Sequence, residues 1–204
     1  MIKNIIFDVA GVLVDFKWKE RFKELGVPEE EIEPLAAATL NSRVWPEFDR
    51  GVWSDDEVLL GLIKDAPEKE QWIRLIWDRV SVSVTCRSYT RPWIRFLKEQ
   101  GYHVYLLSNW PGKIYDERAE ELSFEKETDG AIFSYRVKMI KPDREIYEKV
   151  LSEYGLKAEE CVFIDDTKIN LPVPESMGIH TIQFVQYEQV VKDLEKLGVP
   201  AFLP

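Results

Sequence analysis

Residues 3–11 read KNIIFDVAG, and this stretch carries the strongest structural signal in the chain. Its β-branched and aromatic residues form a short apolar run that stops at Ala10 and Gly11. Such a run is typical of a buried strand followed by a tight loop. The stretch therefore predicts a buried strand with Asp8 at its carboxyl end.

Strand and helix signals alternate from residue 88 to the end of the chain. Helices are expected at 92–100, 113–122, 143–154 and 188–197, and strands at 102–107, 131–134, 161–164 and 179–184. Gly101 and Gly155 follow two of these helices, as glycines often do at helix ends. The alternation predicts an α/β fold, a doubly wound, Rossmann-like parallel sheet with helices on both faces. In such sheets ligands bind beyond the carboxyl ends of the strands.

Only helical signals occur between residues 16 and 87. Pro28 opens a helix over 29–40, and a capping box at 54–57 precedes another over 58–64. We therefore expect two parts: an α/β core made of residues 1–15 and 88–204, and an inserted all-α helical domain of residues 16–87.

Composition and charge exclude several classes of protein. The chain has 204 residues, is 45% hydrophobic and carries a net charge of −10, so it can form a core and disfavours nucleic acid and anionic membranes as partners. Its two cysteines, Cys86 and Cys161, have no partners at metal-ligand spacing and suggest neither a disulfide framework nor zinc. With no apolar run long enough to cross a bilayer, we expect a cytoplasmic protein.

Three carboxylates follow two of the expected strands: Asp8, Asp165 and Asp166. They would repel one another if brought together, unless a hard divalent cation neutralised them. Mg²⁺ is the natural candidate, because it takes oxygen ligands and tolerates water and a substrate phosphate in its shell.

Three further polar side chains are expected at the same edge of the sheet. Ser108 and Asn109 end the strand at 102–107, and Lys141 follows a later strand region. A hydroxyl, an amide and a mobile positive charge suit the oxygens of a phosphoryl group. Together with the carboxylates they predict a phosphate-binding pocket.

Four segments carry a resemblance to a known family. They are IIFDVAGVLVD around Asp8, LLSN ending at Asn109, KPDREIY starting at Lys141 and VFIDDTKIN containing Asp165 and Asp166. In this order they resemble the motifs of the haloacid dehalogenase-like (HAD) hydrolase superfamily, over essentially the whole chain. The helical insertion then resembles the cap domain of that family. FDRGVWSDDEV and KPDREIYEKVL are similar to segments of its bacterial α-D-glucose-1-phosphate phosphatases.

The resemblance implies a role for each site residue. Asp8 would be the nucleophile that forms an aspartyl-phosphate, and Lys141 would stabilise the charge of the phosphoryl group. Ser108, Asn109 and Lys141 would bind the substrate phosphate. The Mg²⁺ ligands would be Asp8, the main-chain carbonyl of Ala10, Asp165 and Asp166.

The function that follows is Mg²⁺-dependent hydrolysis of a small phosphorylated metabolite, with glucose 1-phosphate as the first substrate to test. A dehalogenase, a phosphomutase and a catalytically weakened protein that only binds such a metabolite are the alternatives. The sequence leaves the oligomeric state open.

Two positions depart from the family pattern. Phosphatases of the superfamily generally carry an acid two residues after the nucleophile, where this chain has Ala10. Its loss should matter, because general acid catalysis contributes about 10² to 10⁴ in rate; a cap residue or water could substitute. Prolines at 172 and 174 predict that the helix after Asp166 begins late, near Pro174.

The aromatic residues of the insertion allow two interpretations. Trp72 and Trp77 have helical spacing and are expected in the core. The stretch 45–50, which contains Trp45, Glu47, Asp49 and Arg50, is less regular and is a candidate substrate-facing loop. Trp110, directly after the second motif, could close over the pocket.

Overall fold

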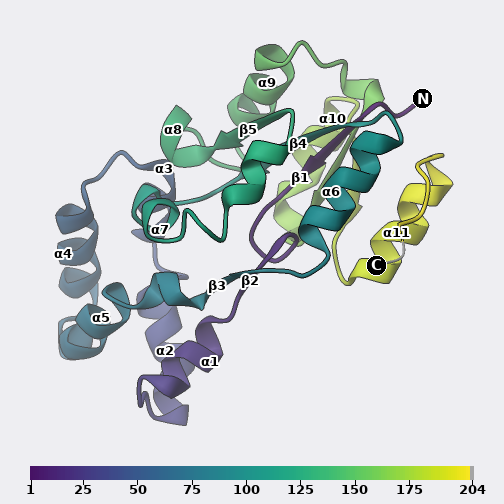
Figure 1. The fold of residues 1–204 in the computed structure, drawn as a ribbon. Coiled ribbons are helices and arrows are strands. Elements are labelled where there is room, and N and C mark those ends of the chain that lie inside the picture. The colour runs from purple at the N-terminus through teal and green to yellow at the C-terminus, as the bar shows by residue number, and fades with distance from the viewer. Residues whose placement is uncertain (203–204) are drawn as a thin grey trace.

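The computed structural model describes residues 1–202, and its centre is a five-stranded, wholly parallel sheet (Figure 1). The strands, in their order across the sheet, are β5 (Gly130–Phe133), β4 (His103–Ser108), β1 (Asn4–Phe7), β6 (Cys161–Asp165) and β7 (His180–Gln183). From β1 the chain builds the sheet outward through β4 and β5, then returns to build β6 and β7 on the other side. The strand order therefore reverses at β1, and the ligand-binding edge lies at its carboxyl end. The predicted α/β class is confirmed.

Alternate residues of the strands pack against two different layers of helices. Ile5 and Phe7 face α6 (Thr90–Glu99) and α11 (Tyr187–Lys196), in one hydrophobic cluster. Ile6 faces α9 (Arg144–Glu153) and α10 (Pro172–Ser176), in a second cluster. Both faces of the sheet are covered, which is why its strands read as continuous apolar runs.

The insertion contains five α-helices between two short strands, β2 (Val14–Phe16) and β3 (Val84–Cys86). The helices are α1 (Trp18–Glu24), α2 (Glu29–Ala38), α3 (Trp45–Arg50), α4 (Asp55–Asp65) and α5 (Glu70–Trp77), with 3₁₀ turns at Pro67–Lys69 and Val80–Ser83. Figure 1 shows these helices to one side of the sheet, with β2 and β3 leading to them. The division of the chain at residues 15/16 and 87/88 into two domains stays a prediction.

The all-helical interpretation of 16–87 is wrong at its two ends. Strands β2 and β3 pair antiparallel, with Val14 opposite Cys86 and Phe16 opposite Val84. Three residues are too short to show an alternating pattern, and the pairing joins segments about seventy positions apart. Local sequence signals cannot report such a pairing.

The start of α4 and the two tryptophans of α5 can be compared with the sequence-based predictions. The capping box is confirmed: Ser54 Oγ accepts a hydrogen bond from the Glu57 main chain at 3.3 Å, and the Glu57 carboxylate accepts one from the Ser54 main chain at 2.8 Å. Trp77 is buried as expected, and Trp72 is half-buried against the core.

Several expected helices have different bounds, and for two of them the structure shows the physical reason. Helix α10 begins at Pro172 rather than near Pro174, because the first main-chain N–H groups of a helix have no partner within it and proline loses nothing there. The helix expected over 113–122 is α7 (Gly112–Glu117), which stops where Arg118 Nε donates to the Ser81 carbonyl of the insertion at 2.8 Å. A tertiary contact therefore replaces the continued helix.

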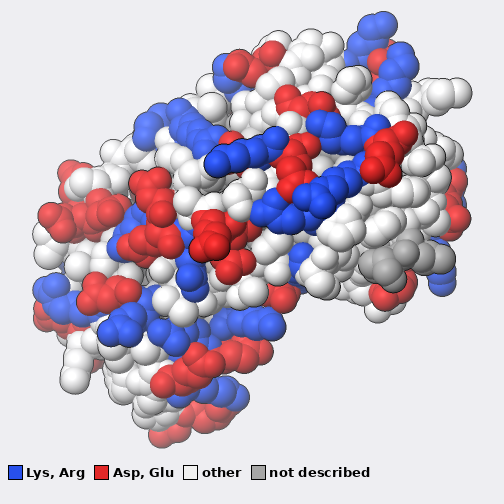
Figure 2. All heavy atoms as spheres, viewed as in Figure 1, with Lys and Arg blue, Asp and Glu red and all other residues white. Residues whose placement is uncertain are grey.

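Three further features bear on the expectations drawn from composition: the apolar character of the helices, the state of the cysteines and the distribution of charge on the surface. None of the helices described in residues 1–202 combines the length and apolar character needed to span a bilayer. Cys86 and Cys161 are both free thiols. Acidic and basic side chains are interspersed over the face shown in Figure 2, so this face has no continuous patch of one sign.

The central sheet should be sensitive to loss of volume. Leu106 of β4 is fully buried, and we expect Leu106→Ala to reduce the free energy of unfolding by about 2–5 kcal/mol through lost burial and the cavity left behind. Ile169→Ala, at a side chain that is 67% exposed, should change it by less than about 0.5 kcal/mol. Urea unfolding followed by circular dichroism measures both.

Candidate active site

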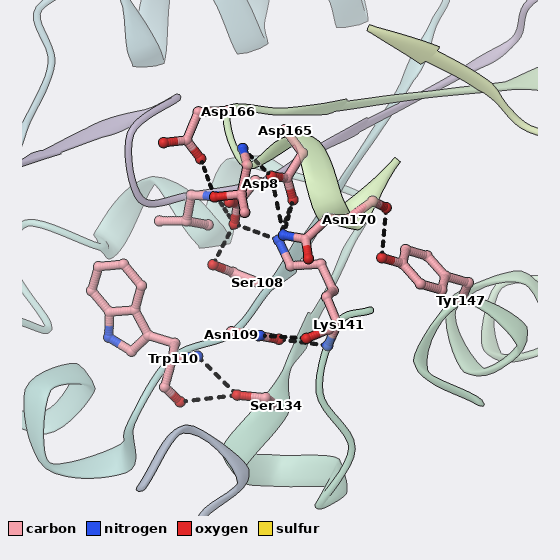
Figure 3. A network of polar contacts seen from close by, with 12 residues as sticks. Asp8, Ser108, Asn109, Trp110, Ser134, Lys141, Tyr147, Asp165, Asp166 and Asn170 are labelled. Atoms are coloured by element: carbon pink, nitrogen blue, oxygen red, sulfur yellow. Dashed lines mark hydrogen bonds and ion pairs between the residues drawn. The ribbon is translucent and has the colours of Figure 1, made fainter. Parts of the chain in front are cut away.

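Asp8 follows β1 at the edge of the sheet where the strand order reverses, and its carboxylate is buried. Its Oδ1 atom accepts hydrogen bonds from Ser108 Oγ at 2.6 Å and from the Val9 main chain at 2.7 Å, and it lies 2.9 Å from Lys141 Nζ (Figure 3). Among residues 1–202, no donor binds Oδ2. One carboxylate oxygen is thus fixed by three donors, while the other is available for chemistry.

Lys141 lies between two carboxylates. Its Nζ atom is 2.9 Å from Asp8 Oδ1 and 2.6 Å from Asp165 Oδ2, and its side chain is 1% exposed. Burial by itself would lower the pKa of Lys141, but the two carboxylates outweigh burial and raise the pKa. The buried lysine therefore stays charged.

Asn109 holds the loop that carries Lys141. Its Nδ2 donates to the Lys141 carbonyl at 2.9 Å, and its Oδ1 accepts from the Lys141 main-chain N–H at 2.8 Å. The side-chain amide therefore fixes the position of the lysine, a role that the sequence analysis did not predict. Asn109 also lines the cavity in front of Asp8, and its predicted contact with phosphate stays a prediction.

Asp165, the last residue of β6, is enclosed by donors on both carboxylate oxygens. Oδ1 accepts from the Thr167 main chain at 2.7 Å and from Asn170 Nδ2 at 3.2 Å, and Oδ2 accepts from Asn170 Nδ2 at 3.0 Å and from Lys141. The Asn170 carbonyl in turn accepts from the hydroxyl of Tyr147 at 2.7 Å. Sequence reasoning gave Asn170 no role, although it lies within the fourth motif.

Asp166 lies against the loop after β1. A Cβ atom on Gly11 would come 2.3 Å from Asp166 Oδ2, so only glycine leaves room for this carboxylate. Gly11 also has a φ of +73°, which favours glycine. One carboxylate oxygen from each of Asp8, Asp165 and Asp166 lies within 4.8 Å of the others.

This carboxylate cluster fits a divalent cation. Burial raises the pKa of Asp8 to about 7, against the lowering effect of Lys141 and with the added repulsion of Asp165 and Asp166. Burial and the Asp165 charge also raise the pKa of Asp166. Mg²⁺ prefers oxygen ligands and would relieve this repulsion, so the residues present fit the ion that the sequence predicts.

A cavity of about 850 Å³ opens in front of Asp8 and continues into a recess of about 170 Å³. Ala10, Phe16, Asp49 and Asn109 line both. The recess is otherwise mainly apolar, with Trp45, Val84, Trp110, Pro111 and Ile114 in its wall. Trp110, expected to close over the pocket, is buried in this wall.

The stretch 45–50 is helix α3 and not the loop that its irregular sequence indicated. Trp45 and Asp49 face the cavities, Glu47 lines a separate depression with Arg43 and Trp53, and Arg50 is 3.4 Å from the Asp143 carboxylate. Burial raises the pKa of Asp49 to about 8, with Lys141 acting in the opposite direction and Asp8 in the same direction.

A sequence model of the haloacid dehalogenase-like hydrolases matches residues 2–178. The chain belongs to this family. It is 28% identical to the sesquiterpene phosphatase astK of Aspergillus oryzae, over 87% of each chain. It is 25% identical to the D-ribitol-5-phosphate phosphatase of Bacteroides thetaiotaomicron, over 90% of this chain and 92% of that one.

Solved structures agree with this membership. The HAD family enzyme bt-2542 of Bacteroides thetaiotaomicron, in complex with magnesium and inorganic phosphate, superposes with a TM-score of 0.70 at 25% identity, covering 93% of this chain and 99% of that one. A HAD-like hydrolase from Porphyromonas gingivalis shares the fold with a TM-score of 0.71 at 23% identity, over 97% and 98% of the two chains. The resemblance to the superfamily is confirmed.

The raised pKa of Asp8 predicts that ionisation of this group lowers the free energy of unfolding of the metal-free protein. Between its ordinary value of 3.8 and about 7, the folded protein binds more protons at Asp8 than the unfolded chain does, so this group makes stability fall as pH rises through that window. Asn cannot ionise. We therefore expect Asp8→Asn to raise the melting temperature in EDTA most at pH 8, and by progressively less toward pH 5.

Differential scanning calorimetry of both proteins across this pH range measures the difference. Asp56→Asn, at an exposed carboxylate of α4, controls for the loss of an acid elsewhere. A gap between Asp8→Asn and wild type that is constant with pH, or that widens toward pH 5, would contradict the expectation.

Proposed function

We propose that this chain is a phosphatase that hydrolyses small phosphomonoesters through an aspartyl-phosphate on Asp8, in a Mg²⁺-dependent reaction. The observation that carries the proposal is the state of the Asp8 carboxylate: Oδ1 is held by three donors, Oδ2 has none among the described residues, and a cavity lies in front. A carboxylate held in this way is oriented for nucleophilic attack.

Each neighbouring side chain would then have a separate role in phosphoryl transfer. Asp8 Oδ2 attacks phosphorus, and Ser108 and the Val9 main chain keep the carboxylate in position. The Lys141 ammonium, fixed by Asp165 and by the Asn109 amide, balances negative charge at the attacked phosphoryl group. Water then hydrolyses the aspartyl-phosphate. Electrostatic stabilisation by fixed charges is the main contribution that a protein makes to this chemistry.

Asp8, Asp166 and the Ala10 carbonyl would hold Mg²⁺, with Asp165 assisting beside them. When bound, the ion would neutralise charge on the carboxylates and on the phosphate. Asp165 is better suited to the assisting role, because both of its oxygens already accept hydrogen bonds from Thr167, Asn170 and Lys141.

A sugar phosphate such as glucose 1-phosphate is the first substrate to test. Relatives named as a D-ribitol-5-phosphate phosphatase and a phosphorylated carbohydrates phosphatase, the latter from Thermotoga maritima and 27% identical over 89% of this chain, support this substrate class. The recess that adjoins the cavity in front of Asp8 is lined by Phe16, Trp45 and Trp110 and can accommodate the alcohol part of such an ester. A protein that only binds a phosphorylated metabolite is the alternative, because Ala10 removes the usual acid.

Phosphate release from a panel of esters tests the proposal. Glucose 1-phosphate, glucose 6-phosphate, nucleotides and an aryl phosphate are each incubated with Mg²⁺ or with EDTA. We expect release with Mg²⁺ and none with EDTA, and a loss of about 10³-fold or more in Asp8→Asn, because the nucleophile is removed. Binding of phosphate esters without release from any of them would favour the binding-protein alternative.

Mg²⁺ should also stabilise the folded chain. At a concentration of about 100 times Kd, a ligand of the native state adds about 2.7 kcal/mol, which for a domain of this size is a rise of about 5–10 °C in melting temperature. Asp166→Asn should abolish most of this rise, while Asp56→Asn should keep it. An equal rise in Asp166→Asn would place the metal elsewhere.

A further inference from the structure

The leaving oxygen of a phosphomonoester needs a proton, and the usual donor of the family has no counterpart at Ala10. Ala10 lines both the cavity and the recess, so its small side chain leaves space where that donor would lie. Any substitute must reach this space from another element. An acidic side chain that lines both the cavity and the recess meets this requirement.

Asp49 is such a side chain. It belongs to the last turn of α3 and lines the cavity with Asp8 and Lys141, and it also lines the recess with Ala10 and Asn109. The phosphoryl group would lie against Asp8 and Lys141, and the alcohol would extend into the recess. The ester oxygen that joins the two parts would therefore lie next to Asp49.

Helix α3 is fixed to the core by contacts that bracket Asp49. The Asp49 carbonyl accepts a hydrogen bond from Ser134 Oγ, and Ser134 Oγ accepts one from the Trp110 main chain at 2.8 Å (Figure 3). The Gly51 carbonyl accepts a hydrogen bond from Lys138. Arg50 is paired with Asp143 at 3.4 Å. These contacts hold the main chain at Asp49, so its side chain has a defined position over the site.

The carboxyl group of Asp49 is not used in these contacts. Among residues 1–202, no side chain or main-chain group donates a hydrogen bond to it, and it forms no ion pair. Leaving a half-buried carboxyl group without a hydrogen-bond partner lowers the stability of the fold. Such a group in a native structure is a candidate for a functional role. Its raised pKa, caused first by burial, agrees with a proton held at neutral pH.

We propose that Asp49, a residue of the helical insertion, is the general acid and base that replaces the family's acid at position 10. The proposal rests on the phosphatase function proposed above.

The proton balance is complete with this one residue. As Asp8 Oδ2 forms its bond to phosphorus, the bond between phosphorus and the leaving oxygen breaks, and the Asp49 carboxyl proton passes to that oxygen to give the alcohol. In the second step the Asp49 carboxylate takes a proton from water as the water oxygen attacks phosphorus. The Asp8 carboxylate leaves, inorganic phosphate forms, and Asp49 is protonated again.

The test compares two esters of similar shape, phenyl phosphate and 4-nitrophenyl phosphate. The phenol is a poor leaving group and depends on protonation, whereas the nitrophenol leaves readily without it. We expect Asp49→Asn to lower kcat/KM, which reports formation of the aspartyl-phosphate and not its later hydrolysis, by about 10²- to 10⁴-fold for phenyl phosphate and by less than about tenfold for 4-nitrophenyl phosphate. Equal losses on both esters, or no loss on phenyl phosphate, would overturn the proposal.

Glu47→Gln is the matched control. It removes a carboxylate from the same helix, but Glu47 lines a different depression with Arg43 and Trp53. We expect both esters to be hydrolysed with the wild-type ratio of rates. A change of that ratio equal to the change in Asp49→Asn would show that the charge of α3, and not a proton at Asp49, controls selectivity, and would overturn the proposal.

A second variant keeps the test decisive if Asp49→Asn is poorly folded or inactive. The double variant Ala10→Asp, Asp49→Asn restores an acid at the family's usual position, and we expect it to recover at least tenfold in kcat/KM on phenyl phosphate. Circular dichroism and the Kd for inorganic phosphate establish that the site is intact. An intact double variant without recovery would count against Asp49 as the acid.

Failure of the underlying function gives a different result. If wild-type protein with Mg²⁺ releases no phosphate from 4-nitrophenyl phosphate, the phosphatase proposal fails, and the Asp49 proposal fails with it. If wild type is active and Asp49→Asn leaves the ratio of the two rates unchanged, only the Asp49 proposal fails.

Discussion

The buried ammonium group of Lys141 connects the strands that form this site. It lies between the carboxylates that end β1 and β6, at 2.9 and 2.6 Å, and almost none of its side chain reaches solvent. Removing the lysine would leave two neighbouring carboxylates buried without a positive charge, and an uncompensated buried charge typically costs about 3–5 kcal/mol. Lys141 and the two aspartates therefore form one unit, in which the ammonium group offsets the repulsion between the carboxylates.

The hydrogen-bond donors around this unit hold some of its carboxylate oxygens in place and leave another, Asp8 Oδ2, without a partner among the described residues. Ser108 and the Val9 main chain hold Asp8 Oδ1, Asn170 and Thr167 hold Asp165, and the Asn109 amide holds the main chain of Lys141. Asp8 Oδ2 and the carboxylate of Asp166 remain for substrate and metal. Fixed donors of this kind need no rearrangement when charge develops during a reaction.

The helical insertion contributes residues to the wall of the site. Strands β2 and β3 lead the chain away from the sheet and back, and α3 returns to it through contacts with Ser134, Lys138 and Asp143. The insertion therefore supplies one wall of the recess and the Asp49 carboxyl group. Under the proposal for Asp49, the insertion supplies the acid that the first loop lacks at Ala10.

Much of the core could be predicted because its signals are local. The apolar run before Asp8, the alternation after residue 88 and the polar residues at strand ends indicated a parallel sheet and the edge at which Asp8, Ser108, Lys141, Asp165 and Asp166 meet. Parallel strands bring their carboxyl ends to one edge, so strand assignment alone was enough to bring these residues together. The predicted start of α10, near Pro174, was wrong because proline at the first positions of a helix is compatible with a helix start, and the helix begins at Pro172.

Consecutive residues were sufficient to indicate the class of fold, the family and the acids and lysine of the site, because periodicity and motif order are local properties of the chain. The packing of strands and helices was needed to show which oxygen of Asp8 is held, that Asn109 and Asn170 position other residues, and that Asp49 and Ala10 line the same cavity and recess. Apart from the contact of Asp8 with the next residue, these relations join residues from 5 to more than 100 positions apart through side-chain rotamers and packing between elements. Such contacts depend on how helices and strands are placed against one another, which local patterns do not specify.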